Sequence, residues 1–106
     1  MDARTQARFG ARARILKALA HPTRLFIVDV LARKARCVCE LAEMVGADMS
    51  TVSKHLALLR AAGIVGAEKR GSQVFYRLQC QCVPDFLDCA ESVLRETARE
   101  QSVLAR

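Results

Sequence analysis

Cysteines are the residues of this chain whose types and spacing most clearly allow chemistry. The five form two Cys-x-Cys pairs and one single thiol: Cys37 and Cys39, Cys80 and Cys82, and Cys89. Thiolates bind soft metal ions and attack oxidants, so the pairs indicate metal binding or redox chemistry. An odd number excludes a closed intrachain disulfide framework, and neither spacing matches the wider Cys or His pairs of a zinc finger. In a reducing cytosol we expect free thiols.

The spacing of the first pair constrains its backbone. On an ideal helix, residues two apart point about 200° away from each other and cannot share an ion. On an extended segment they share a face, so Cys37 and Cys39 are expected on an extended stretch or at a bend that starts a helix. Lys34 and Arg36 precede the pair and a helix N-terminus follows it. Both features predict a lowered thiol pKa and favour the thiolate.

Composition indicates a globular, basic chain. With 106 residues, 52% of them hydrophobic, residues 1–106 are expected to form one domain with a small core. The net charge of +6 is typical of proteins that meet a phosphate backbone. No signal peptide is recognisable and no stretch approaches the roughly 18 apolar residues of a membrane helix, so we expect a cytoplasmic protein without a membrane partner.

Hydrophobic periodicity and turn residues predict the elements that must position these side chains. Pro22 suits the first position of a helix, Gly46 a helix stop, and Asp48 an N-cap for the N–H groups that follow it. The apolar run 25–31 is expected to be buried on most sides. The predicted order is helix 4–19, a helix from Pro22, a short helix ending at Gly46, helix 48–63, a hairpin turning at 70–72 with strand 73–78, and a helix opened by Pro84.

Helix 48–63 separates into two faces on a helical wheel. Val52, Leu56, Leu59 and Gly63 fall within about 40° of one another and are expected to pack inward. The outward half offers short hydroxyls and one cation, which suits a helix lying in a major groove: Ser50, Thr51, Ser53 and Lys54. A well-capped solvated helix would look the same.

Three further residues have two interpretations each. His55 lies near the edge of the inward stripe, where a packing role is favoured over a base contact or metal ligation. Lys69 and Arg70 form the tip of the hairpin. By default this tip is a solvated turn, but beside a recognition helix the two cations become candidates for phosphate or minor-groove contacts.

Together the elements predict a mainly α fold with a β-hairpin wing, the winged helix-turn-helix.

Three segments carry a family resemblance: "LKALAHPTRLFIVDVL", "CVCELAEMVGADMSTVSKHLALLRAAGIV" and "KRGSQVFYRL". Over residues 13–79 the chain resembles the ArsR/SmtB family of metal(loid)-responsive transcriptional repressors. The resemblance implies a homodimer paired through its first and last helices, bound to palindromic operator DNA and released by a metal or metalloid. By position, the resemblance implies that the recognition helix carries Ser50, Thr51, Ser53, Lys54 and His55. It implies that the wing carries Lys69, Arg70 and Gly71, and that the "CVC" metal box consists of Cys37 and Cys39.

The chain also departs from the family's patterns. The arsenic-sensing version often has a third cysteine where this chain has Ala42, and the cadmium and lead version draws thiols from an N-terminal arm that here has none. The zinc sensors use His and carboxylates on the last helix, which here has Asp85, Asp88 and Glu91 but no His, so that site is not expected.

A complete site needs further ligands, since trivalent arsenic takes three sulfurs and cadmium or lead three or four. In winged helices the segment before the short helix often lies against the returning wing strand, which here ends at "YRLQCQC". We therefore expect Cys80 or Cys82 to meet Cys37 and Cys39 within one subunit. Cys89 is as consistent with a buried core thiol as with a ligand.

The function expected is a repressor that releases DNA on binding a thiophilic ion, arsenite first, with cadmium or lead as alternatives. A second reading is a thiol redox or persulfide sensor, in which Cys37 or Cys39 would join Cys80 or Cys82, because an i, i+2 disulfide is strained. A third is a metal-buffering or protein-binding module that does not touch DNA. An enzyme is disfavoured because no Ser-His-Asp set, phosphate loop or paired carboxylates are present.

Overall fold

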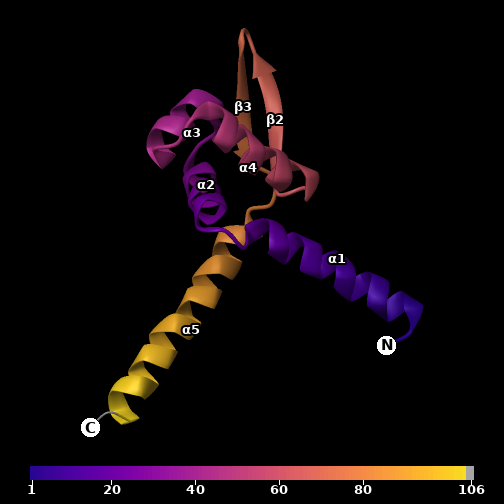
Figure 1. Cartoon of the computed structure of the whole chain (residues 1–106), viewed down its shortest axis with the longest axis vertical. Helices are drawn as coiled ribbons and strands as arrows, with labels where there is room; N and C mark the ends of the chain where they lie inside the picture. Colours follow the sequence, from indigo (N-terminus) through magenta and orange to yellow (C-terminus); the bar gives the residue numbers. More distant parts are fainter. Residues whose placement is uncertain (105–106) are drawn as a thin grey trace.

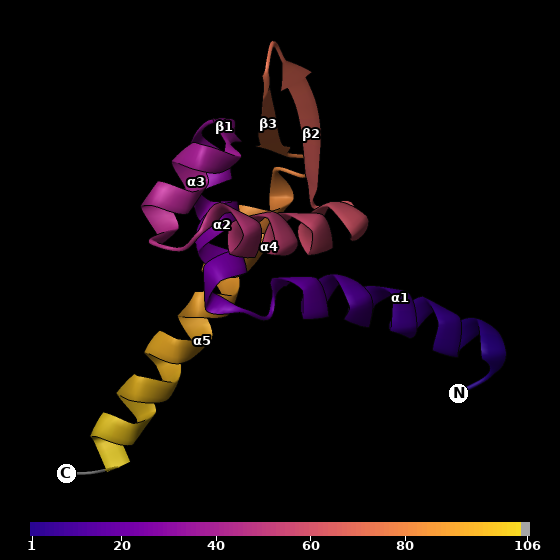
Figure 2. The same cartoon turned by 45° about the horizontal axis from the view of Figure 1, so that its top comes forward.

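The structure is a computed structural model and describes residues 1–104. Over these residues, five helices and three short strands follow one another (Figures 1 and 2). Their bounds are α1 Ala3–Leu19, α2 Pro22–Arg33, β1 Arg36–Cys37, α3 Val38–Val45, α4 Met49–Ala61, β2 Val65–Arg70, β3 Gln73–Leu78 and α5 Cys82–Leu104. The expected mainly α fold with a β-hairpin wing is confirmed.

Local signals end and begin the helices as the sequence predicts. Pro22 opens α2, and the side chain of His21 caps it by accepting a hydrogen bond from the Thr23 N–H at Nδ1, 3.1 Å away. Gly46 ends α3 in the left-handed conformation, with φ at 80°. Asp48 caps α4 by accepting the Thr51 N–H at 2.7 Å. The tight turn between α3 and α4 therefore rests on one glycine and one carboxylate.

The core lies where α2, α3 and α4 meet the base of the wing. Its fully buried side chains come from all four parts of this head: Ile27, Val28, Leu41, Val52, Leu56, Leu59 and Val65. The run 25–31 is buried less completely than expected, because Leu25 and Phe26 remain exposed on α2. A helix packed on one side of a small head leaves its opposite face open.

The wing is a three-stranded antiparallel sheet in the order β1-β3-β2. Strands β2 and β3 are joined by a two-residue turn in which Gly71 has φ of 63°. On its other edge, β3 pairs with the two residues that precede α3, and Cys37 lies opposite Phe75. This pairing ties the first cysteine pair to the wing, as the sequence predicts.

Helix α5 begins two residues earlier than predicted, at Cys82 rather than Pro84. The first turn of a helix leaves its N–H groups without intrahelical partners, so a proline, which has no N–H, fits anywhere in that turn. Pro84 is therefore compatible with the first turn but does not fix the first residue.

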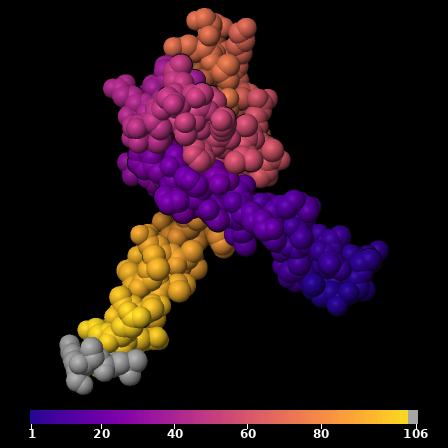
Figure 3. Space-filling view, in the orientation of Figure 1, coloured from indigo at the N-terminus to yellow at the C-terminus, as the bar shows by residue number. Residues whose placement is uncertain are grey.

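Helices α1 and α5 project away from the head in different directions, as Figures 1, 2 and 3 show. The molecule measures 57 × 42 × 22 Å along its principal axes. Large apolar side chains are exposed along both helices: Phe9, Ile15 and Leu16 on α1, and Phe86, Val93, Leu94 and Val103 on α5. Within residues 1–104 no helix combines the length and hydropathy needed to span a bilayer.

Candidate functional site

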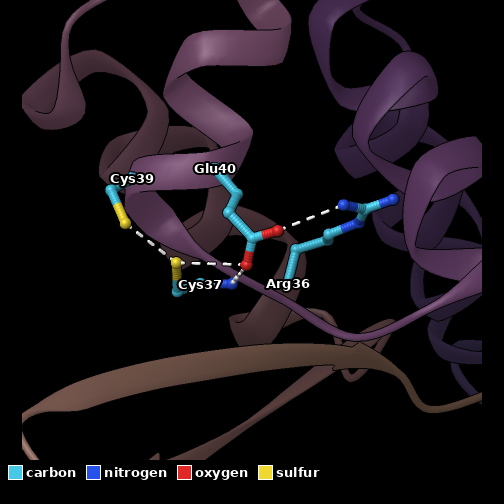
Figure 4. A network of polar contacts seen from close by, with 4 residues as sticks. All are labelled: Arg36, Cys37, Cys39 and Glu40. Carbon is cyan, nitrogen blue, oxygen red and sulfur yellow. Dashed lines mark hydrogen bonds and ion pairs between the residues drawn. The ribbon is translucent and has the colours of Figure 1, made fainter.

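The first cysteine pair lies at the junction of the wing and the helix-turn-helix (Figure 4). Cys37 ends β1 in an extended conformation, and Cys39 lies in the first turn of α3. The bend brings the two Sγ atoms within 2.8 Å of each other. Cys37 is buried and Cys39 is exposed, so the pair is reached from solvent on one side only. The predicted bend at the start of a helix is confirmed.

Glu40 connects this pair to a cation. Its Oε1 accepts the N–H of Cys37 at 3.4 Å and the Sγ–H of the same residue at 3.3 Å. Its Oε2 accepts a hydrogen bond from Arg36 Nη1 at 3.1 Å. The hydrogen bond from Arg36, followed by those from Cys37, lowers the pKa of the Glu40 carboxyl. A carboxylate therefore lies against the buried thiol at neutral pH.

The prediction of a lowered thiol pKa is wrong for Cys37. Its pKa is raised, first by the hydrogen bond with Cys39 and then by burial. Arg36 does not reverse this, because its guanidinium is directed at Glu40 rather than at the sulfur. Cys37 thus holds its proton until a base or a thiophilic ion replaces it.

Cys80 and Cys82 form a second pair, whose Sγ atoms are also 2.8 Å apart. The expected meeting of this pair with Cys37 and Cys39 in one subunit does not occur. Cys37 lies opposite Phe75, and the chain then runs five residues further along and beyond β3 before reaching Cys80. Among residues 1–104, no three His, Cys, Asp or Glu side chains are grouped in a way that could hold a metal ion.

The remaining cysteine, Cys89, is exposed on α5 rather than buried in the core of the protomer. It lies 40° round the helix from the acidic Asp85, at the edge of the apolar stripe that includes Phe86 and Val93. Within the described residues it belongs to no metal-holding group with either cysteine pair.

The outward face of α4 carries the residues predicted to read DNA, and all four polar ones are exposed: Ser50, Thr51, Ser53 and Lys54. Ser50 also donates its hydroxyl to Asp48 Oδ1 at 2.9 Å. At the wing tip Lys69 and Arg70 are exposed, and the guanidinium of Arg70 lies 4.8 Å from the centroid of the Phe75 ring. The helix and the wing tip thus present hydroxyls and cations to solvent.

His55 is half-buried and faces back toward α2. Its ring lies 4.5 Å from that of His21, tilted by 48°, and its Nδ1 has no hydrogen-bond partner within the described protein atoms. Burial, followed by the nearby charges of His21 and Arg24, lowers its pKa. The ring is neutral at neutral pH and packs at the α2–α4 junction.

Sequence reasoning missed Glu40, which accepts hydrogen bonds from both Cys37 and Arg36. The available signal was a capping pattern in which Cys37 precedes a helix and Glu40 occupies its third position. The same reasoning missed His21, whose capping role follows from its place directly before Pro22.

Comparison with known proteins places this geometry in a family. The profile described as "Bacterial regulatory protein, arsR family" matches residues 21–66, from the cap of α2 into β2. The HTH-type transcriptional repressor SmtB of Mycobacterium tuberculosis is 44% identical over 68 residues, which cover 64% of this chain and 50% of that repressor. The chain therefore spans about half the length of this curated relative.

Other relatives are matched over more of their length. The HTH-type transcriptional regulator Rv0081 of M. tuberculosis is 36% identical over 84 residues, which cover 78% of this chain and 74% of the relative. Its crystal structure superposes with a TM-score of 0.79 at 32% identity, covering 89% of this chain and 95% of that one.

A solution structure extends the comparison to a homodimer. The winged helix-turn-helix domain of Mb0332 from Mycobacterium bovis, described as homodimeric and as a possible ArsR-family regulator, superposes with a TM-score of 0.81 at 31% identity, covering 94% of this chain and 93% of that one. These relatives are transcriptional regulators and not enzymes. The chain belongs to the ArsR family of bacterial regulatory proteins, with the winged helix-turn-helix fold.

Proposed function

We propose that the chain is a cytoplasmic transcriptional repressor that binds operator DNA as a homodimer and is released when a thiophilic ion binds Cys37 and Cys39. The observation that carries the proposal is the 2.8 Å approach of these two sulfurs at the start of α3, inside the helix-turn-helix. Arsenite is the ion we propose first, with cadmium or lead as alternatives, because all three are soft acceptors of thiolate.

The exposed face of α4 and the wing tip support DNA binding. Ser50, Thr51 and Ser53 provide short hydroxyls for close approach to base edges, while Lys54 provides a positive charge. Lys69 and Arg70 extend the positive surface from the recognition helix onto the wing, where phosphates run beside the groove. The net charge of +6 per chain favours the same partner.

The projecting helices support a homodimer. Val93 and Leu94 on α5 are 62% and 69% exposed, and Phe9 on α1 is 48% exposed, which is costly for a protomer alone in water. Helix α1 carries five cations and no acid over Ala3–Leu19, whereas α5 carries two cations, Arg95 and Arg99, and five acids: Asp85, Asp88, Glu91, Glu96 and Glu100. Two copies can cover the apolar stripes while they place opposite charges side by side.

The two thiols fit a soft ion in part. They converge on one point, and the exposed Cys39 gives the ion access to the buried Cys37. Two sulfurs leave at least one position of trivalent arsenic to a further donor, such as an oxygen from solvent. Within the described residues of one chain, Cys80, Cys82 and Cys89 form no metal-holding group with this pair, so the proposed ligands are Cys37 and Cys39.

Glu40 provides the physical link between ion binding and DNA release. Ion binding removes the Sγ–H that donates to Glu40 at 3.3 Å, so the carboxylate loses this hydrogen bond and must find another partner. The rearrangement acts on the first turn of α3, which packs against α4, and on the pairing of Cys37 with the wing. A coupling free energy of about 1–3 kcal/mol would weaken DNA binding by roughly 5- to 150-fold.

The test is a gel shift with a palindromic operator under strong reductant, titrated with arsenite, cadmium and lead. We expect one of these ions to release the protein, and the Cys37→Ser/Cys39→Ser variant to stay bound. Charge-transfer absorption from sulfur to metal in the ultraviolet reports ligation directly. Because Cys37 must lose a proton of raised pKa, ion affinity should increase with pH up to that pKa.

The matched control is Cys89→Ser, which removes an exposed thiol from α5 and should respond to the ion like the unchanged protein. Release of the Cys37→Ser/Cys39→Ser variant at the same ion concentration would contradict the proposal. Failure of the unchanged protein to bind any palindrome in a salt-dependent manner would contradict its DNA-binding part.

A further inference from the structure

The second cysteine pair has no role in the function proposed above. Cys80 lies in the short connection between β3 and α5, and Cys82 is the first residue of α5. Both side chains are exposed, and their Sγ atoms are 2.8 Å apart. The backbone makes a turn here, in which the Val83 N–H donates to the Cys80 carbonyl at 3.3 Å. Two thiols in contact on a turn are a reactive arrangement with no evident packing role.

We propose that Cys80 and Cys82 form a separate redox site, which hydroperoxides convert reversibly into a Cys80–Cys82 disulfide that changes operator binding. The described residues place no third thiol, His or carboxylate in a metal-holding group with this pair. A disulfide needs only the two sulfurs already in contact. The proposal goes beyond ion sensing at Cys37 and Cys39, and only its DNA readout rests on the proposed function.

The two thiols are not equivalent, which sets the order of the chemistry. The hydrogen bond from the Cys82 thiol, and then backbone N–H groups at the start of α5, lower the pKa of Cys80. The Cys80 hydrogen bond and charge raise the pKa of Cys82. Cys80 is therefore the thiolate that attacks, and Cys82 the thiol that resolves.

The reaction balances with hydrogen peroxide as the oxidant. The Cys80 thiolate attacks one peroxide oxygen, the O–O bond breaks, and the departing hydroxide takes a proton to become water. The sulfenic acid formed on Cys80 is then attacked by the sulfur of Cys82, which loses its proton as the S–S bond forms and a second water departs. A disulfide between residues two apart is strained, which makes it readily reduced by a dithiol and suits a reversible switch.

The position of the pair connects it to DNA binding. Cys82 and Val83 line a groove together with Ile15, Leu16 and Leu19 of α1, on the side where we place the second subunit. On the other side of the pair, the Gln79 N–H donates to the Ile64 carbonyl at 2.9 Å and fixes the base of the wing. Closing a ring between Cys80 and Cys82 therefore changes the direction in which α5 leaves the wing.

Peptide mapping tests the disulfide, because trypsin separates the two pairs. Cleavage after Lys and Arg leaves Cys37 and Cys39 on peptide 37–54, and the other three cysteines on peptide 78–95. The reduced full chain is treated with hydrogen peroxide, alkylated, digested and analysed by mass spectrometry. We expect peptide 78–95 to lose two hydrogen atoms and carry one alkyl group, on Cys89, while peptide 37–54 carries two.

Variants separate this site from the ion site in the operator gel shift. Peroxide should change operator affinity by about fivefold or more, which is the lower limit of the affinity changes typical of allosteric coupling between two sites. Dithiothreitol should restore the original affinity. The effect should persist in Cys37→Ser/Cys39→Ser and in Cys89→Ser, and disappear in Cys80→Ser and in Cys82→Ser.

Three results would overturn the proposal. They are a cross-link between peptides 37–54 and 78–95, full alkylation of Cys80 and Cys82 after peroxide, and a Cys80–Cys82 disulfide that leaves operator affinity unchanged. Loss of ion sensing in Cys37→Ser/Cys39→Ser bears only on the proposed function, because the peptide map of residues 78–95 does not depend on it.

Discussion

At the residue scale, two positions matter most for α4. One caps its N-terminus, and the other packs its side against α2. The Asp48 carboxylate accepts hydrogen bonds from the Thr51 N–H and the Ser50 hydroxyl in the first turn. The His55 ring packs against His21 at the junction with α2. Hydrogen bonds from Thr51, then that from Ser50, lower the pKa of Asp48. Both residues therefore make the stability of the DNA-reading helix depend on pH, and both do so in the same direction.

The Asp48 carboxylate stabilises the fold only when it is ionised. Because its folded-state pKa is lowered, its contribution is present above the unfolded pKa of about 3.9 and is lost as pH falls through the folded pKa. Asp48→Asn keeps a capping oxygen but cannot titrate, so its urea midpoint should fall less between neutral pH and about pH 3. Asp48→Ala should be less stable than both proteins at neutral pH. Equal acid sensitivity of Asp48→Asn would refute this role.

His55 is stabilising in its neutral form. Its pKa is lowered on folding, so the unfolded chain takes up a proton first as pH falls. Stability should be highest above the unfolded pKa of about 6.5 and should decline from there down to the folded-state pKa. His55→Gln should flatten the dependence of unfolding free energy on pH over about pH 7 to 5, measured by urea denaturation. An unchanged slope in that variant would assign the effect to another group.

At the scale of elements, the spacing of α3 and α4 depends on a backbone conformation rather than on a contact. Gly46 has φ of 80°, and a Cβ added there would meet no atom within 4 Å, so only the backbone conformation resists a side chain. The turn sets the direction from which α4 leaves α3. Its glycine is thus a determinant of how the recognition helix is presented.

Gly46→Ala should therefore destabilise the fold by about 1 kcal/mol, because a left-handed conformation is unfavourable for alanine. Gly10→Ala is the matched control, since Gly10 lies inside α1 and its added Cβ would make only an ordinary contact with Arg14 at 3.8 Å. That control should gain about 0.5–1 kcal/mol from helix propensity. Chemical denaturation of the two variants side by side checks both signs, and a stabilising Gly46→Ala would refute the strain argument.

At the scale of the whole molecule, the open arrangement of α1 and α5 is the feature that most needs a second chain. Leu94 is 69% exposed and lies within the apolar stripe of α5, while the head buries its own core without this helix. The free energy of covering the stripe is therefore available for association. Because operator half-sites lie about 34 Å apart, one head cannot occupy both.

Leu94→Glu should weaken the dimer at least tenfold, because it places a charge where an apolar surface is to be covered. Arg99→Glu is the matched control, with the same new side chain five residues on and about 140° round the helix. Analytical ultracentrifugation gives the dissociation constants, and the gel shift should show a parallel loss of operator affinity for Leu94→Glu alone. Equal weakening by both variants would place the interface elsewhere.

The sequence alone determined what depends on neighbours along the chain. Pro22, Gly46 and Asp48 set helix ends through φ preferences and unpaired N–H groups, and the spacing of Cys37 and Cys39 required a bend, because these effects act within a few residues. The period of Val52, Leu56 and Leu59 likewise predicted the buried face of α4.

Only the tertiary structure decided which distant groups meet. The register of β1 on β3 places Cys37 against Phe75 and keeps Cys80 away, although both cysteines flank the wing in sequence. The contact with Cys39, followed by burial, raised the Cys37 pKa against the expected shift, while Arg36 lies against Glu40 and not against the sulfur. Strand register and side-chain direction depend on how whole elements pack. That packing decides whether the two cysteine pairs form one joint site or two separate sites.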